Sequence, residues 1–290
     1  MSPSEKIFTV LNYIVLTFLV IICVIPFIHL IALSFSSSAA ATSGTVGLIP
    51  KDFTIAAYKL AIEGKSFITA FMVSVKRVFL AVIINLIIMI LTAYPLSKSD
   101  KVLPGRKFFS GYLIATMLIS GGMIPLFMVV RSLKLANTIW ALILPGAMSV
   151  WNTFMMMNFF RRLPKELEES AVIDGASQIQ VLSRIVMPLS LPIIATMTLF
   201  VAVGHWNEWF SALIYMDSIK DYPLQTYLQM IITTPDYSQL DTLQLEEAAK
   251  VSNKNFQAAQ ILIATVPILV VYPFCQKYFV TGLTIGSVKG

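Results

Sequence analysis

The sequence predicts an all-α integral membrane protein with about six transmembrane helices. Hydrophobic residues make up 57% of the 290 positions and charged residues only 12%, which is about half the charged share of a soluble domain. The apolar residues also gather in long runs, each sufficient to cross a hydrocarbon core of ~30 Å as a helix. These runs are unbroken rather than alternating, which argues against an outer-membrane barrel. Helices are expected because lipid offers the backbone no hydrogen-bonding partner.

The predicted spans cover residues 7–34, 70–96, 108–130, 138–160, 189–215 and 256–280. The first is followed by Ala39–Ala41, which resembles a signal-peptide cleavage site. Its apolar run is longer than the ~7–15 residues of a signal peptide, so a retained helix is expected. Lys76 and Arg77 lie near the start of the second span. Their side chains either reach the membrane interface or face the protein interior.

Short basic loops predict the orientation of the chain. Residues 98–107 hold four lysines and arginines, and residues 161–188 hold another four, whereas the longer loops 35–66 and 216–255 are thinly basic. Because cationic residues concentrate on the cytoplasmic side, both termini and residues 161–188 are expected in the cytoplasm. The two longer loops are then external. Residues 1–290 form one transmembrane domain, ending in a cytoplasmic tail at 281–290.

Several kinds of chemistry find no support in the sequence. The chain lacks a G-x-x-x-x-G-K-[ST] phosphate loop, an H-E-x-x-H motif and paired C-x-x-C motifs, so no catalytic residue or metal ligand is predicted. The net charge of +6 is typical of cations that flank spans rather than of nucleic-acid binding. Glu208 is the only acid in a predicted span, whereas ion-coupled carriers usually hold more buried ionisable groups.

The most polar interruption of the apolar pattern is residues 161–188. Pro164 suits the first turn of a short helix whose first two turns are rich in glutamate. Asp174-Gly175 should end this helix, with Gly175 left-handed, and Ser177 should cap a second helix that Met187-Pro188 closes. This element is either an interfacial amphipathic connector or a knob that enters a groove on a cytoplasmic partner.

Residues 169–188 resemble the EAA loop of the permease subunits of bacterial ABC importers. That loop reads E-A-A-x-x-x-G, then nine residues, then I-x-L-P; here Ser170 replaces the first alanine and Met187 the leucine. The end of the chain, KYFVTGLTIGSVKG, resembles the tail of the second permease of maltose-type carbohydrate importers. WNEWF, at 206–210, is similar to a motif in those permeases, and 121–145 resembles the branch that imports complex oligosaccharides or polysaccharide fragments.

The resemblance implies the type I ABC importer permease fold in a bacterial cytoplasmic membrane. It implies a heterodimer with a sister permease, two cytoplasmic ATP-binding subunits and an external solute-binding protein that delivers a carbohydrate. ATP and Mg²⁺ would then bind to the partner ATPases, with no cofactor on this chain and no nucleic acid. A stand-alone secondary carrier or channel is the alternative, and a membrane-embedded enzyme is a more distant one.

The resemblance also implies three groups of functional residues. ATPase coupling is expected at Glu168, Glu169, Ala171, Asp174, Gly175, Ala176, Ile185 and Pro188. The substrate path is expected at Trp206, Asn207, Glu208 and Trp209, with Asn152 and Asn158 as weaker candidates. Tail contacts with the ATPases are expected at Gly282, Thr284, Gly286 and Lys289. The tryptophans could instead form an interfacial belt, Asn207 could bond a neighbouring helix, and Met155–Met157 are expected to pack.

Overall fold

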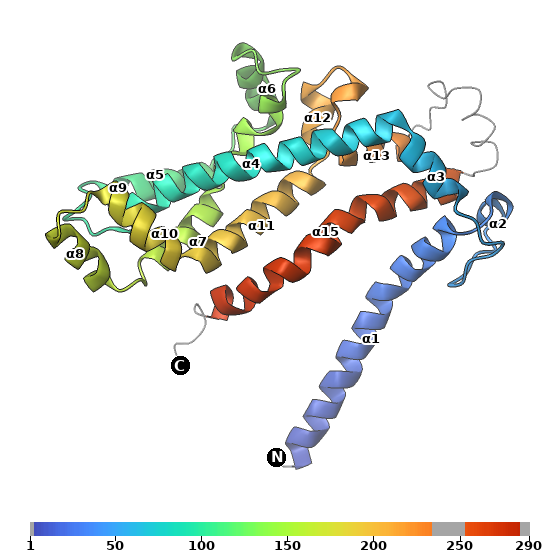
Figure 1. The fold of residues 1–290 in the computed structure, drawn as a ribbon, viewed down its shortest axis with the longest axis horizontal. Coiled ribbons are helices and arrows are strands. Elements are labelled where there is room, and N and C mark those ends of the chain that lie inside the picture. The colour runs from blue at the N-terminus through green and yellow to red at the C-terminus, as the bar shows by residue number, and fades with distance from the viewer. Residues whose placement is uncertain (1–2, 234–252, 285–290) are drawn as a thin grey trace. The chain divides into compact units, whose positions relative to one another are not determined.

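The computed structural model describes residues 3–233 and 253–284, which are helical and contain no β-strand (Figure 1). They belong to two compact units. The first unit is Met1–Thr69 with Tyr227–Pro267, and the second is Ala70–Thr226 with Ile268–Gly290. The residues proposed for coupling and for the substrate path all lie in the second unit.

The first unit is built around the end of the first predicted span. It contains α1 (Pro3–Ser34), α2 (Ser38–Ser43), α3 (Ala56–Glu63) and the first part of α15 (Asn253–Thr284). The ring of Phe35 stacks on Tyr58 with centroids 4.7 Å apart, and Asn255 donates to the carbonyl of Ser36 at 3.0 Å. Within the described residues, the most apolar window of α1 has no buried residue.

The second unit contains most of the remaining helices. They are α4 (Lys65–Ser97, from Ala70), α5 (Arg106–Leu118), α6 (Met123–Ser132), α7 (Val150–Phe160), α8 (Lys165–Ile173), α9 (Gln178–Val181), α10 (Met187–Leu189), α11 (Leu191–Asn207), α12 (Phe210–Tyr215) and the start of α13 (Leu224–Thr233). Short helices η1 (Ile139–Leu142), η2 (Leu144–Gly146), η3 (Leu182–Val186) and η4 (Ile219–Asp221) complete it.

Three helices of the second unit share its main core. Met89 of α4, Met156 of α7 and Met197 of α11 are all fully buried in one cluster. Methionine is unbranched and fills irregular gaps between helices. The expected packing role of Met155–Met157 is therefore confirmed, with Met157 buried and Met155 partly buried against the same cluster. This core holds α4, α7 and α11 together. Beside it lies the polar segment 161–188, which we call the polar connector.

Three of the predicted spans are not single helices, which corrects the sequence interpretation. Among the described residues, α1 and α4 are each long and apolar enough to span a membrane, and up to five spans result if each bent helix pair counts as one. Segment 108–130 bends by 114° between α5 and α6, where Gly122 has φ +83°. Segment 138–160 bends by 54° between the short η helices and α7, after Pro145.

The fifth predicted segment, 189–215, is broken as well. It begins after an 82° bend and is divided at Glu208 between α11 and α12. The two early cations of the second span separate: Lys76 is exposed, whereas Arg77 is 1% exposed and faces the interior. At the other end of the chain, α15 continues to Thr284, so Gly282 and Thr284 lie in a helix rather than in an extended tail. Gly286 and Lys289 fall outside the described residues, as do residues 234–252 of the predicted external loop 216–255.

Candidate functional site

The first half of the polar connector is a short helix with a closed end. Residues Lys165–Ile173 form α8, which starts directly after Pro164 and carries glutamates in its first turn, where the helix dipole favours acids. Gly175 has φ +84°. Its N–H donates to Val172 at 3.0 Å and that of Ala176 donates to Ala171 at 2.9 Å, which is the Schellman arrangement. The helix end predicted at Asp174-Gly175 is confirmed.

The second half starts with a capping box. The hydroxyl of Ser177 accepts from the N–H of Gln180 at 3.4 Å, and the side-chain oxygen of Gln180 accepts from the N–H of Ser177 at 2.8 Å. This confirms the predicted cap. The helical run ends at Leu189, one residue beyond the predicted close at Met187-Pro188. A π-turn, η3, precedes Pro188 and rearranges the hydrogen-bond ladder where proline lacks a donor.

The turn between the two halves brings most of the predicted coupling residues together. A hollow of about 390 Å³ lies between α8 and the second half, lined by Ala171, Asp174, Gly175, Ala176, Gln180, Arg184 and Ile185. Five of the eight predicted coupling residues are in this set. Asp174 in its lining and Glu169 nearby are exposed. The apolar side chains of Ile173 and Ile179 are 84% and 78% exposed. We call residues 165–189, with this hollow, the coupling loop, after the role that the sequence resemblance predicts for it.

Glu168 has an unexpected partner within its own chain. Its carboxylate forms an ion pair with Lys98, at the end of α4, and the two side chains are only 20% and 14% exposed. The ammonium of Lys98 also lies 3.9 Å from the centre of the Tyr94 ring, and the Tyr94 hydroxyl donates to the side chain of Gln178 at 3.1 Å. Figure 1 shows α8 to α10 gathered at this end of α4. No sequence motif marks Lys98, Tyr94 or Gln178 as partners of this segment.

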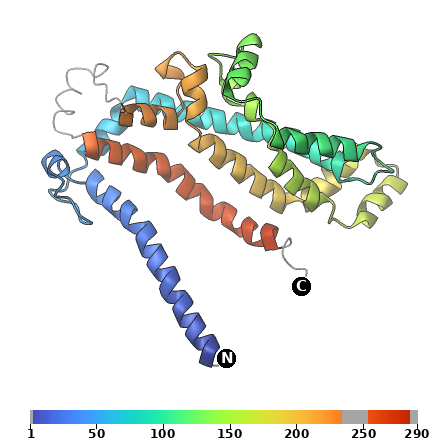
Figure 2. The ribbon, with the colours of Figure 1, turned by 180° about the vertical axis from the view of Figure 1, so that it is seen from behind.

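The break between α11 and α12 contains the WNEWF motif. Trp206 is 6% exposed and packs edge-on against Phe71, with ring centroids 5.7 Å apart. Asn207 is exposed, and Trp209 is 39% exposed. Trp206 therefore packs inside its own chain, whereas Asn207 and Trp209 present side chains on the surface. Figure 2 shows the step from α11 to α12 from behind.

Glu208 holds this break together rather than presenting a free carboxylate. One carboxylate oxygen accepts from the N–H of Ser211 at 2.8 Å, in the first turn of α12. The other lies 2.5 Å from Arg77, whose guanidinium also donates to the carbonyls of Glu208 at 3.0 Å and of Leu142 at 3.2 Å. A buried arginine needs such a partner because an unpaired buried charge is costly. The weaker candidates on α7 are partly buried (Asn152) and exposed (Asn158).

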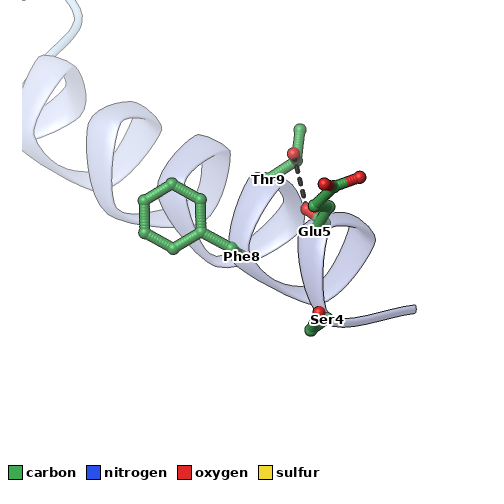
Figure 3. Close-up of a pocket in the computed structure, with 4 residues that line it drawn as sticks. All are labelled: Ser4, Glu5, Phe8 and Thr9. Atoms are coloured by element: carbon green, nitrogen blue, oxygen red, sulfur yellow. Dashed lines mark hydrogen bonds between the residues drawn. The ribbon is translucent and has the colours of Figure 1, made fainter. Parts of the chain in front are cut away.

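A second hollow, of about 500 Å³, lies at the start of α1 (Figure 3). Its four lining residues, Ser4, Glu5, Phe8 and Thr9, all belong to the same two helical turns. Thr9 donates to the carbonyl of Glu5 at 2.7 Å, a bond that a helix makes with its own preceding turn. Since all of its described lining residues come from one exposed helix, this hollow is a groove along α1 and is not taken as a candidate site.

Comparison with known proteins identifies the family. Residues 5–285 match the family described as binding-protein-dependent transport system inner membrane component. The protein LplC of Bacillus subtilis strain 168 is 41% identical over 100% of this chain and 97% of its own length. The polygalacturonan/rhamnogalacturonan transport system permease protein YtcP of the same strain is 39% identical over 99% of this chain and 100% of its own length.

Similarity to a solved structure extends to the fold. The crystal structure of a bacterial ABC transporter involved in the import of the acidic polysaccharide alginate contains a chain with a TM-score of 0.88 and 31% identity. The match covers 96% of this chain and 99% of that one. The type I permease fold is thereby established, and the sequence resemblance to ABC importer permeases is confirmed. The chain belongs to the family of binding-protein-dependent transport system inner membrane components, and it is a permease subunit of an ABC importer.

Proposed function

We propose that this permease forms, with a sister permease, the translocation path for an oligosaccharide or polysaccharide fragment. An external solute-binding protein delivers the substrate, and two cytoplasmic subunits bind ATP and Mg²⁺. The substrate class is supported by a relative named for polygalacturonan and rhamnogalacturonan transport at 39% identity, and by likeness to an alginate importer at 31% identity. The chain itself hydrolyses no ATP in this scheme.

The orientation in the proposal places the coupling loop in the cytoplasm with both termini. It is supported by the basic loops 98–107 and 161–188. The protein is then a multi-pass component of the bacterial cytoplasmic membrane. External loops 35–66 and 216–255 face the solute-binding protein.

The single observation that carries the proposed coupling is the closed turn at Gly175. Two hydrogen bonds fix the end of α8 there, and the turn forms one wall of the hollow at the coupling loop. Exposed carboxylates of Glu169 and Asp174 would meet cationic side chains of an ATPase, and Ile173 would enter an apolar pocket. Closure of the ATP-bound subunits would then push a rigid element rather than a flexible loop.

Asn207 and Trp209 are the candidates for substrate contact that the geometry leaves available. A sugar offers hydroxyl groups to an amide and an apolar ring face to an indole. Glu208 would act indirectly, because its carboxylate is occupied by Arg77 and Ser211. Trp206 would support the break from inside the chain.

The substrate class is tested by ATP hydrolysis in the complete importer. The complex is reconstituted in nanodiscs with its solute-binding protein, and hydrolysis is measured with pectic, alginate and maltose-type oligosaccharides in parallel. We expect an oligosaccharide to raise hydrolysis at least several-fold above the unliganded binding protein. Stimulation by monosaccharides, amino acids or metal ions, and by no oligosaccharide, would remove the proposed substrate class while leaving the permease family intact.

A further inference from the structure

We propose that α4 is a rigid strut that carries motion of the coupling loop to the break between α11 and α12. Lys98 and Tyr94 bind the loop at one end, and Arg77 binds the break at the other. The proposal rests on the proposed coupling function and adds the route inside this subunit. It assigns Lys98, Tyr94 and Arg77 as positioning residues.

The end of α4 holds both halves of the coupling loop. Lys98 pairs with Glu168 in α8, and Tyr94 donates to Gln178 in α9 at 3.1 Å. These two attachments lie on either side of the turn at Gly175. The position of the Lys98 ammonium 3.9 Å from the Tyr94 ring joins them into one cluster through a cation–π contact. A push on the loop would therefore reach α4 from two points.

Two arginines fasten the same end of α4. Arg161, just after α7, donates to the carbonyl of Leu96 at 3.0 Å. Arg106, at the start of α5, donates to the carbonyl of Lys98 at 2.9 Å. Cations at the last carbonyls of a helix satisfy acceptors that have no partner within the helix and complement its dipole. The end of α4 is thus held by contacts from α5, from the end of α7, from α8 and from α9, and is not a frayed terminus.

The middle of α4 is suited to transmit displacement. About 30 Å of helix separates Arg77 from Ser97, at a rise of ~1.5 Å per residue. Along this length Ala81, Met89 and Ala93 are fully buried in the main core, and close-packed interiors deform little. The direct covalent route, from α10 into α11, passes through an 82° bend. A bend can change its angle, whereas α4 has no proline between Arg77 and Tyr94, and its one proline, Pro95, lies in the last turn, so this packed length can move as one piece.

At the far contact, Arg77 reaches three acceptors around the break. It bonds the carboxylate and the carbonyl of Glu208 and the carbonyl of Leu142. Glu208 in turn caps α12 through Ser211. A shift of α4 would therefore move the residue that lies between Asn207 and Trp209, the proposed substrate contacts. This places the coupling loop and the substrate path on one helix.

A charge exchange tests the contact between Lys98 and Glu168. In the reconstituted importer, Lys98→Glu and Glu168→Lys are each expected to lower the uptake per ATP hydrolysed at least fivefold. The double exchange should restore it to within twofold of the wild type. Lys107→Glu is the matched control, because Lys107 lies nine residues further along, in the first turn of α5, and its side chain is 84% exposed. A purely structural role would change the amount of assembled complex but not the ratio of uptake to hydrolysis.

A covalent bridge tests the rigid-body claim independently of folding effects. Cys23 and Cys275 are replaced by serine, and cysteines are placed at Lys98 and Glu168 and joined by a short bismaleimide. Because the proposal holds that both residues move together, the bridged importer should retain at least half of its uptake. Single-cysteine variants treated with the same reagent are the control. Loss of more than nine tenths of uptake on bridging would overturn the strut.

Failure of the strut and failure of the proposed function give different results. If the wild-type complex transports and both single exchanges behave like Lys107→Glu, the strut is wrong and the function stands. A double exchange no better than Glu168→Lys, in assembled complex, also overturns it. If a single-exchange variant loses its ATPase subunits during purification, uptake by the bridged double-cysteine importer decides whether the strut is correct. If the wild-type complex itself shows no substrate-stimulated hydrolysis, the proposed function fails first.

Discussion

Replacement of Gly175 should destabilise the closed turn of the coupling loop. The free-energy cost should come from the backbone conformation alone. Its φ is +84°, and a Cβ added there would meet no atom within 4 Å. Steric clash with neighbours is therefore absent, and the cost is that of holding an L-residue in a left-handed conformation. That cost is about 1–2 kcal/mol for an ordinary residue, lower for asparagine and higher for a β-branched residue.

This cost should appear as weaker binding of the ATPase subunits. If the ATPase recognises only the closed turn, 1–2 kcal/mol corresponds to a roughly 5- to 30-fold weaker affinity. We expect the order Gly175→Asn, Gly175→Ala, Gly175→Val, from mildest to most severe. The assay is titration of purified ATPase onto the permease heterodimer in nanodiscs, together with uptake and substrate-stimulated hydrolysis.

Gly105 provides a matched control for this series. It has φ +82°, lies before α5, and a Cβ there would have its nearest atom, in the Phe109 ring, at 3.9 Å. Gly105→Ala should therefore cost a similar backbone free energy outside the coupling loop. Equal ATPase affinity in Gly175→Ala and Gly105→Ala would refute the reasoning, and so would normal affinity and uptake in Gly175→Val.

Three further predictions concern the break and the caps. Glu208→Gln removes the charge that faces Arg77 but keeps an acceptor, and because the Glu208 side chain is 33% exposed it should lower the free energy of unfolding by about 1–3 kcal/mol, seen as earlier thermal unfolding in detergent; an unchanged melting temperature would contradict a stabilising ion pair. Asn207→Ala and Trp209→Ala should raise the substrate concentration needed for half-maximal uptake while the complex stays assembled; normal uptake in both would favour an interfacial or packing role. Ser177→Ala should cost about 1 kcal/mol by removing half of the capping box, measured by urea or thermal unfolding, and Ser183→Ala, whose hydroxyl bonds only within its own helix turn, should cost less.

Local rules of helix ends predicted the shape of the coupling loop. Ser177 and Gly175 were both identified from sequence, because an N-cap and a left-handed C-terminal residue depend on neighbours within a few positions. The second helix ends one residue beyond the predicted Met187-Pro188, and the π-turn before Pro188 was missed because an apolar pattern does not reveal it. The closed turn and its capping box depend on a short segment, so they can be predicted without knowledge of the tertiary fold.

Apolar run lengths predicted the spans but not their breaks. Residues 7–34 and 70–96 correspond to α1 and α4, whereas 108–130 is divided by a sharp bend. Gly121-Gly122 was the available signal for this bend, since paired glycines mark turns between helices. The division at Glu208 had no such local signal, and the side chain that contacts it, Arg77, is 131 positions away.

The ion pairs that define the strut could not be predicted from one sequence. Arg77 and Glu208 are 131 positions apart, and Lys98 and Glu168 are 70 apart. Such pairs depend on tertiary packing and not on local pattern. The presence of Arg77 in an apolar run indicated only that it needed a partner, and the structure identifies that partner.

Uptake of an oligosaccharide into proteoliposomes tests whether this chain works as one permease subunit of an ATP-driven importer. The vesicles contain this chain with its sister permease and ATPases, and the solute-binding protein and a radiolabelled oligosaccharide are added on the external face. The account predicts accumulation that requires ATP, the binding protein and both permeases, and that is lost in Gly175→Val. Accumulation by this chain alone, without ATP or partners, would contradict it.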